Sequence, residues 1–466
     1  MSAELREDKR ALIAVDLGAE SCRVSLFRWR HGRAQIELIH RFGNAPDPHL
    51  YGLRWNLDRI VAGVDEGLRQ CAAIAEEGVR SIAVDGWAVD YVRLRADGGA
   101  AANPFCYRDS RNAAAFQSLH GLIPAARLRE LTGIQLQPIN TVYQLHADAL
   151  SGAEQARWLN LPEYLLHAWG GAAVAERTNA THTGLVALDG NWCEEIFNAA
   201  GIDIRNAPRI VEPGTEVGEY SGSVTRLRGA KLIAPCCHDT ASAVAGIPAE
   251  GEDWAYISSG TWSLVGTVLR EPCNNADAAR ENFTNLGVAG RRVLFHKGIP
   301  GMWLLKQSME AWNVRDVAWL VEQARAIAPF APQELIDVED PRLAAPGDMP
   351  ASINVQRASR GLAPVSEPAE LTRLILDSLA GRYAQVLRSV ERITGRKLAR
   401  IYVVGGGSQN ELLNQLTAQA TGLPVLRGPV ESSTIGNFAV QLASGDGDTS
   451  AENVARWAVR LAKAPV

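Results

Sequence analysis

The segment His238-Asp239-Thr240 combines residue types that can bind a hydroxyl group and take a proton from it. An apolar stretch precedes the segment and small residues follow it up to Ala245, so Asp239 is expected where a strand gives way to a helix. Downstream, the turn Ser258 to Ser263 offers hydroxyl and backbone N–H donors to an anion. This pairing suits transfer of a phosphoryl group to a hydroxyl. Taken alone, Asp239 is equally suited to cap a helix.

Three turns rich in glycine and hydroxyl residues each follow an apolar run. They cover Asp16 to Arg23, Ser258 to Ser263 and Gly405 to Ser408. Any one of them is ordinary turn chemistry, whereas together they indicate a nucleotide site. None has the Gly-x-x-x-x-Gly-Lys-Ser/Thr pattern of a P-loop, and the glycine run lacks the Gly-x-Gly-x-x-Gly spacing of a dinucleotide fold. A different nucleotide-binding architecture is therefore expected.

Apolar runs that predict strands recur in both halves of the chain. Residues 11–27 predict a strand, a turn and a paired strand, and residues 81–85 predict another buried strand. Residues 254–267 and 401–404 repeat this arrangement. Between them, an apolar stripe predicts a helix that is capped by Ser366 and stops at Gly395. Two similar α/β halves are predicted.

Length and composition limit the class of protein. A chain of 466 residues is too long for one compact core and predicts two domains. The formal net charge of -5 provides no basic surface for a nucleic acid. The charged start lacks the apolar core of a signal peptide, and no apolar run reaches the roughly 20 residues that a bilayer span requires. Seven scattered cysteines without Cys-x-x-Cys spacing argue against a disulfide framework and a structural zinc site. We therefore expect a cytoplasmic protein without nucleic-acid or membrane partners.

The order of the motifs resembles that of the FGGY carbohydrate kinases. The motifs begin with Asp-x-Gly-x-x-Ser-x-Arg, continue through the central His-Asp-Thr and Ser-Ser-Gly-Thr-Trp-Ser, and end with Gly-Gly-Gly-Ser-Gln-Asn. The resemblance covers nearly the whole chain, from about Ala11 to Leu442. It implies an α/β fold with duplicated ribonuclease-H-like domains of the actin, hexokinase and Hsp70 type and an active-site cleft between them. Residues 1–243 would be the mainly sugar-binding domain and residues 244–466 the mainly ATP-binding domain.

The resemblance also implies a reaction, the phosphorylation of a small ketose by ATP with Mg²⁺. The expected conversion is L-rhamnulose to L-rhamnulose 1-phosphate by direct in-line transfer. Such a transfer mainly requires alignment of the acceptor oxygen, neutralisation of charge and one proton acceptor. Another ketose, such as L-fuculose or a pentulose, and a non-catalytic sugar or nucleotide sensor are the alternatives. A monomer or a homodimer is expected.

Carried over residue by residue, the resemblance assigns roles to the candidate residues. Asp239 is the expected general base, and Asp16 is expected to orient Mg²⁺ through water. The sugar contacts are expected from Trp87, Ala88, His238, Asp239 and Thr240. The ATP contacts are expected from Ala19, Glu20, Ser21, Cys22, Arg23, Thr261, Gly406 and Gly407.

The chain departs from the family pattern at four notable positions. Cys22 and Ala88 stand where the family has glycine, and both keep a small side chain. Gly298 and Lys306 stand where the family has Asn and Gln that contact the ligands. These last two positions bear on nucleotide affinity and on the choice of phosphate donor.

Overall fold

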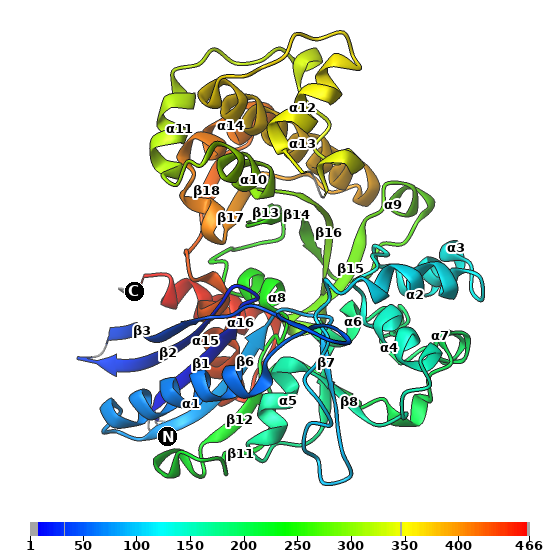
Figure 1. Cartoon of the computed structure of the whole chain (residues 1–466). Coiled ribbons are helices and arrows are strands. Elements are labelled where there is room, and N and C mark those ends of the chain that lie inside the picture. The colour runs from blue at the N-terminus through cyan, green and yellow to red at the C-terminus, as the bar shows by residue number, and fades with distance from the viewer. Residues whose placement is uncertain (1–7, 32, 345–346, 464–466) are drawn as a thin grey trace. The chain divides into compact units, whose positions relative to one another are not determined.

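The computed structural model describes residues 8–31, 33–344 and 347–463. Residues 1–7 and 464–466, where the two predicted domains begin and end, lie outside the described part. The chain divides into two compact units, both drawn in Figure 1. Unit 1 comprises Met1–Ala249, Leu269–Leu294 and Ser432–Val466, and unit 2 comprises Glu250–Val268 and Phe295–Glu431. The division into a sugar-binding and an ATP-binding domain at residues 243 and 244 stays a prediction.

A six-stranded sheet forms the centre of unit 1. Its strands, in order across the sheet, are β11 (Thr215–Glu219), β12 (Lys231–Ala234), β6 (Val79–Gly86), β1 (Ala11–Leu17), β2 (Ser21–Arg30) and β3 (Arg33–Gly43). β1 pairs antiparallel with β2 and parallel with β6. The parallel pairing brings the carboxyl ends of β1 and β6 to the same edge of the sheet.

Several helices pack on this sheet. α1 (Leu57–Ile74) packs on β2 and β3, and α15 (Ser432–Gly445) packs on β1 and β6 (Figure 1). In β2, Val24 lies against Gly67 of α1, and the ring of Phe27 lies 5.7 Å from that of Phe438 in α15. Every residue of β1 is buried, which explains why this strand is an apolar run without alternation.

The other elements of unit 1 are shorter. Small two-stranded pairs join β10 (Arg209–Val211) to β9 (Val174–Glu176), β4 (Asp47–His49) to β5 (Gly52–Arg54), and β7 (Tyr91–Arg93) to β8 (Trp158–Asn160). The remaining strand is β15 (Thr284–Val288). The helices are α2 (Arg111–His120), α3 (Ala125–Thr132), α4 (Thr141–Leu150), α5 (Leu161–Ala168), α6 (Arg177–His182), α7 (Glu194–Ala200), α8 (Asp239–Ala245), α9 (Ala276–Arg280) and α16 (Ala451–Leu461).

Unit 2 repeats the strand pattern of unit 1. Its strands β16 (Arg292–Pro300), β14 (Trp262–Leu269), β13 (Trp254–Ser259), β17 (Arg400–Val404) and β18 (Val425–Arg427) are neighbours in that order. β13 pairs antiparallel with its hairpin partner β14 and parallel with β17, as β1 does with β2 and β6. The predicted duplication of an α/β unit is thereby confirmed.

The helices of unit 2 include one long element. They are α10 (Trp303–Trp312), α11 (Val317–Arg325), α12 (Met349–Ala358), α13 (Pro368–Thr394) and α14 (Glu411–Thr421). α13 ends at Gly395 as predicted, where a φ of 70° favours glycine. Its N-cap is Glu367 rather than the predicted Ser366, because Pro368 occupies the first helical position, which proline favours. Every helix in the described ranges is too short or too polar to cross a membrane.

Candidate active site

The ends of β1 and β6 place two aspartates side by side in unit 1. Asp16 is the register partner of Asp85 across the parallel pairing, and both side chains are buried. Asp239, the first residue of α8, lies close enough for the charge of Asp16 to act on it. Asp85 in turn is influenced by both Asp16 and Asp239. The site therefore gathers three carboxyl groups.

Burial and mutual repulsion disfavour the charged form of two of these groups. Burial and, after it, the negative charge of Asp16 raise the pKa of Asp239 to about 7. The Asp239 side chain nevertheless keeps 39% of its exposure, so a ligand can reach it. Burial and repulsion by Asp16 also raise the pKa of Asp85 well above its ordinary value. A carboxyl group with a pKa near neutrality can both accept and release a proton under physiological conditions.

Residues from the two ends of the chain hold the cluster. Oδ2 of Asp16 accepts hydrogen bonds from Nη1 of Arg23 at 2.8 Å and from Oγ of Ser433 at 2.7 Å. Oδ1 of Asp85 accepts a hydrogen bond from Nδ2 of Asn437 at 2.6 Å. Ser433 and Asn437 stand four residues apart on α15, so one face of this helix serves both aspartates.

The cluster fits a hydrated divalent cation. Oδ2 of Asp85 is buried and accepts no hydrogen bond from the described residues. Carboxylate oxygens are the ligands that Mg²⁺ prefers, and this ion usually keeps several waters beside one or two carboxylates. Within the described residues, no three His, Cys, Asp or Glu side chains converge as a metal cage would require. Contact of Asp16 with Mg²⁺ through water stays a prediction.

The segment before Asp239 is tied to a buried glutamate. Oε2 of Glu176, in β9, accepts the N–H of Cys237 at 2.8 Å and the hydroxyl of Thr178. Oγ1 of Thr178 in turn accepts the N–H of His238 at 3.0 Å. Burial raises the pKa of Glu176 to about 8. Sequence reasoning missed both residues, because a three-residue strand and the helix start behind it carry no recognisable motif.

Three predicted sugar contacts stand together at the start of α8. Oδ1 of Asp239 accepts the N–H of Thr240 at 2.5 Å and the hydroxyl of Thr240 at 3.2 Å. Nε2 of His238 lies 3.4 Å from the same oxygen. Behind it, the ring of His182 lies 4.8 Å from that of His238, and burial lowers the pKa of His182 to about 4. The N-cap of α8 is His238, so Asp239 is the first helical residue and not the cap that the alternative expects. Asp239 remains accessible to a ligand.

Trp87 and Ala88 follow the end of β6, and both are 6% exposed. The indole ring of Trp87 lies 4.5 Å from that of Trp55, and its Nε1 donates to Oδ2 of Asp90 at 3.0 Å. The protein itself therefore covers most of the Trp87 ring. Gly86 forms a β-bridge with His238, which brings this segment to the candidate base.

The predicted phosphate turn of unit 1 is a tight connection between β1 and β2. A side chain at Gly18 would bring its Cβ to 2.4 Å from the carbonyl oxygen of Ser21, so the turn requires glycine there. Glu20 is exposed at the tip, whereas Cys22 is buried. Burial raises the pKa of the Cys22 thiol to about 12, so it stays protonated. The structure thus places Ala19 and Glu20 in the turn and residues 21–23 at the start of β2, where Arg23 is the register partner of Asp16.

The other predicted ATP residues lie in unit 2, where β13 and β17 run parallel and end together. Thr261 is at the tip of the β13–β14 hairpin, and its carbonyl accepts the N–H of Gly301 at 3.0 Å. Gly406 and Gly407 directly follow β17. A Cβ at Gly407 would lie 2.0 Å from Oγ of Ser259, so only glycine lets the two turns approach this closely.

Two of the four departures from the family pattern, Gly298 and Lys306, also lie in unit 2. Gly298 is buried within β16, and Lys306 is exposed on α10. A buried glycine offers a ligand only its backbone, whereas an exposed lysine carries a positive charge at the protein surface.

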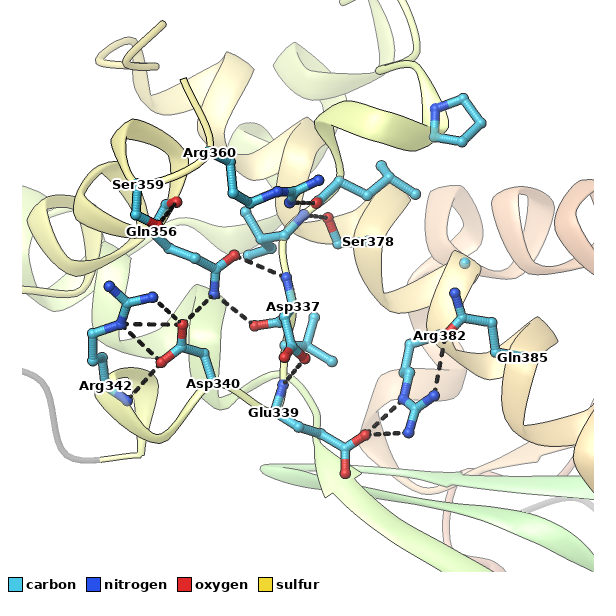
Figure 2. A pocket seen from close by; sticks show the side chains of 15 residues that line it. Asp337, Glu339, Asp340, Arg342, Gln356, Ser359, Arg360, Ser378, Arg382 and Gln385 are labelled. Carbon is cyan, nitrogen blue, oxygen red and sulfur yellow. Dashed lines mark hydrogen bonds and ion pairs between the residues drawn. The ribbon is translucent and has the colours of Figure 1, made fainter. Parts of the chain in front are cut away.

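A separate polar hollow of unit 2 has a volume of about 800 Å³ and lies among α12, α13 and residues 332–342 (Figure 2). Figure 2 shows Arg342 paired with Asp340, at 2.5 Å, and Arg382 paired with Glu339. Arg360 donates to backbone carbonyls. The arginines of the hollow are thus paired within the protein, and its lining includes none of the predicted ATP residues.

Comparisons with known proteins bear on the family to which the chain belongs. The model of the N-terminal domain of the FGGY family of carbohydrate kinases matches residues 11–246, and that of the C-terminal domain matches residues 255–444. The rhamnulokinase of Enterococcus faecalis is 38% identical over 457 residues, covering 94% of this chain and 90% of the relative. The rhamnulokinase of Pectobacterium carotovorum is 37% identical over 443 residues, which cover 92% of this chain and 87% of the relative.

A solved structure shares the fold. The ligand-bound xylulose kinase from Lactobacillus acidophilus has a TM-score of 0.79 with this chain at 17% identity, covering 96% of this chain and 92% of that one. This likeness confirms the predicted fold class. Because the family models match both halves and relatives above 35% identity span almost the whole length, the chain belongs to the FGGY family of carbohydrate kinases.

Proposed function

We propose that this kinase transfers the γ-phosphoryl group of ATP to L-rhamnulose and forms L-rhamnulose 1-phosphate. The identity with two rhamnulokinases over about nine-tenths of the chain supports this substrate. The observation that carries the chemistry is Asp239, a reachable carboxyl group whose pKa is raised to about 7 beside Asp16. The non-catalytic alternative loses support, because the family and the matched relatives are kinases.

Asp239 is the general base in this proposal. It accepts the proton of the sugar hydroxyl as the new bond to phosphorus forms, and it needs little basicity because the proton moves late in a loose phosphoryl transfer. His238, Thr240 and the turn Trp87-Ala88 contact the sugar. Trp87 would contribute mainly by position, since its ring packs on Trp55. Glu176 holds the loop that carries the base.

The proposed ATP contacts are Ala19, Glu20, Ser21, Cys22, Arg23, Thr261, Gly406 and Gly407. Backbone N–H groups of tight turns and the guanidinium of Arg23 suit phosphate oxygens. Asp16 would hold Mg²⁺ through water, and bound Mg²⁺ neutralises charge on the transferring phosphate. Location in the cytoplasm and a monomer or homodimer complete the proposal.

Release of ADP, measured by a coupled assay across a panel of ketoses, tests the function. The panel contains L-rhamnulose, L-fuculose, L-xylulose, D-xylulose, L-ribulose and D-ribulose, with a control that lacks sugar. We expect selective turnover of L-rhamnulose and, in Asp239→Asn, a loss of about 10²- to 10⁴-fold in kcat with sugar binding kept. Normal turnover by Asp239→Asn would refute the assigned base, and selectivity for another ketose would refute the assigned substrate.

A further inference from the structure

Helix α15 carries a row of polar side chains on the side that packs on β1 and β6. The row consists of Ser433, Asn437 and Gln441, which follow one another at intervals of four residues and therefore share one side of the helix. Asn437 and Gln441 are buried, with exposures of 0% and 2%. A helix that packs on a buried sheet normally presents apolar residues there, because a buried amide is costly unless its hydrogen bonds are made. The polar row therefore requires an explanation.

The hydrogen bonds of this row have a fixed direction. Nε2 of Gln441 lies 3.0 Å from the carbonyl oxygen of Ile13, which can only accept, so the amide nitrogen is the donor there. The same nitrogen donates to Oδ1 of Asn437 at 2.8 Å, and Oε1 of Gln441 accepts the hydroxyl of Ser81 at 2.7 Å. With its oxygen engaged, Asn437 donates its amide nitrogen to Oδ1 of Asp85 at 2.6 Å. The row thus ends in a donor that holds one particular oxygen of Asp85.

Two neighbouring aspartates each keep one oxygen that the described residues do not use. Oδ1 of Asp85 accepts Asn437, whereas its buried Oδ2 meets no donor among these residues. In the same described part, the hydrogen bonds to Asp16 all go to its Oδ2, which leaves Oδ1. Asp16 and Asp85 are register partners on parallel strands, which lie about 4.8 Å apart, so their side chains stand on the same face of the sheet. Two oxygens from adjacent carboxyl groups are thus left for one ligand.

The charge of the cluster indicates the class of ligand. The carboxyl groups of Asp16, Asp85 and Asp239 act on one another, and one guanidinium, that of Arg23, acts on all three. Carboxylates this close repel each other, so the cluster favours a positively charged ligand. Carboxylate oxygens suit a hard divalent cation that keeps several of its waters.

We propose that Asp85 is a second carboxylate for the divalent cation of the reaction, and that Asn437 and Gln441 position it. This inference rests on the proposed function, which assigns Mg²⁺ to Asp16 alone. Ser433 and Asn437 lie about 6 Å apart along the axis of one rigid helix, so α15 sets the spacing of the two carboxylates. Residues of this kind orient the groups that bind a metal, and their loss costs about 10- to 100-fold in metal affinity.

Nucleotide binding measured with and without metal tests the role of Asp85. Calorimetry of the intact protein with the ATP analogue adenylyl imidodiphosphate gives one affinity in Mn²⁺ and another in EDTA, and their ratio measures the coupling between metal and nucleotide. In Asp85→Asn a carbonyl oxygen can still accept from Asn437, whereas an amide nitrogen replaces Oδ2. We therefore expect the ratio to fall at least about tenfold. An unchanged ratio in Asp85→Asn, or equal affinities with and without Mn²⁺ in the wild type, would overturn the proposal.

Gln441→Met tests the positioning and keeps both carboxylates. Methionine fills a similar space but cannot hold the amide of Asn437 in its direction. The ratio should fall about tenfold, the Mg²⁺ concentration for half-maximal velocity should rise by a similar factor, and saturating Mg²⁺ should restore kcat. Ser444→Ala is the matched control, because Oγ of Ser444 donates to the carbonyl of Gly214 at 2.7 Å at the other end of the same helix. Equal ratios in Gln441→Met and Ser444→Ala would refute the positioning role.

Ser81→Ala keeps the proposal testable if the other variants fail to fold. It removes only the hydroxyl that Gln441 accepts, at the far end of the row from Asp85. The ratio should fall about two- to fivefold, and an unchanged ratio would also overturn the proposal. Failure of the proposed function looks different, because the titrations contain no sugar. The wild type would then turn over none of the ketoses, while the ratios would keep their expected order.

Discussion

Thr178→Val tests whether the buried bridge from Glu176 through Thr178 to His238 positions the catalytic loop. Valine matches the shape of threonine but removes the hydroxyl that donates to Glu176 and accepts the N–H of His238. Because the pKa of Glu176 is raised to about 8, its carboxyl group is mostly protonated at neutral pH, so the lost bond contributes about 1 kcal/mol. The unpaired N–H of His238 adds about 1–3 kcal/mol. The free energy of unfolding should therefore fall by about 2–4 kcal/mol.

Catalysis should suffer beyond this loss of stability. Without Thr178, the peptide group between Cys237 and His238 loses one of its supports, and Asp239 moves with it. A displacement of about 1 Å at a reacting group costs about 10²-fold in rate, so kcat should fall roughly tenfold to a hundredfold. KM for ATP should stay constant, because the contact lies on the sugar side of the chemistry.

The assay combines coupled ADP release with thermal denaturation, and Thr132→Val is the matched control. Oγ1 of Thr132 donates to the carbonyl of Leu128 at 2.8 Å and accepts the N–H of Ile134 at 3.4 Å, away from the loop. The control should lose comparable stability and keep kcat, and Thr178→Ser should restore kcat. If Thr178→Val lost no more kcat than Thr132→Val, the positioning role of Thr178 would be refuted.

Further tests concern pH and packing. The value of kcat/KM for the ketose should rise with pH through about 7, because Asp239 acts as a base only after it loses its proton, and the absence of this limb would contradict its role. Burial raises the pKa of Glu176 from 4.5 to about 8. The contribution of its protonated carboxyl group to stability is therefore full below about pH 4.5 and is lost as the pH rises through 8. In Glu176→Gln, the free energy of unfolding measured with urea should depend less on pH. Gly436→Ala should lower the free energy of unfolding by about 1–3 kcal/mol, since the new Cβ would lie 1.8 Å from the carbonyl oxygen of Ser242. Gly43→Ala, with open space around it, should change it by less than about 0.5 kcal/mol.

Local sequence determined the elements and the chemistry of the motifs. The apolar run of β1, the paired strand after a glycine turn and the end of α13 at Gly395 follow from preferences that act over a few residues. The same range of interactions places Asp239 at the start of a helix. The order of such motifs was sufficient to identify the family and its fold, because each motif is a local signal and the family orders them in one way.

The tertiary structure decided which residues share the site and how they titrate. Ser433 reaches Asp16 across 417 positions of the chain, and Asn437 reaches Asp85 across 352. Asp85 ends a strand that the sequence predicts, yet its role depends on register with Asp16. The sequence named Asp239 as a base, but only burial beside Asp16 sets its pKa near neutrality. Contacts between distant segments depend on the path of the whole chain, and burial depends on everything packed around a group, so neither can be read from neighbours in sequence.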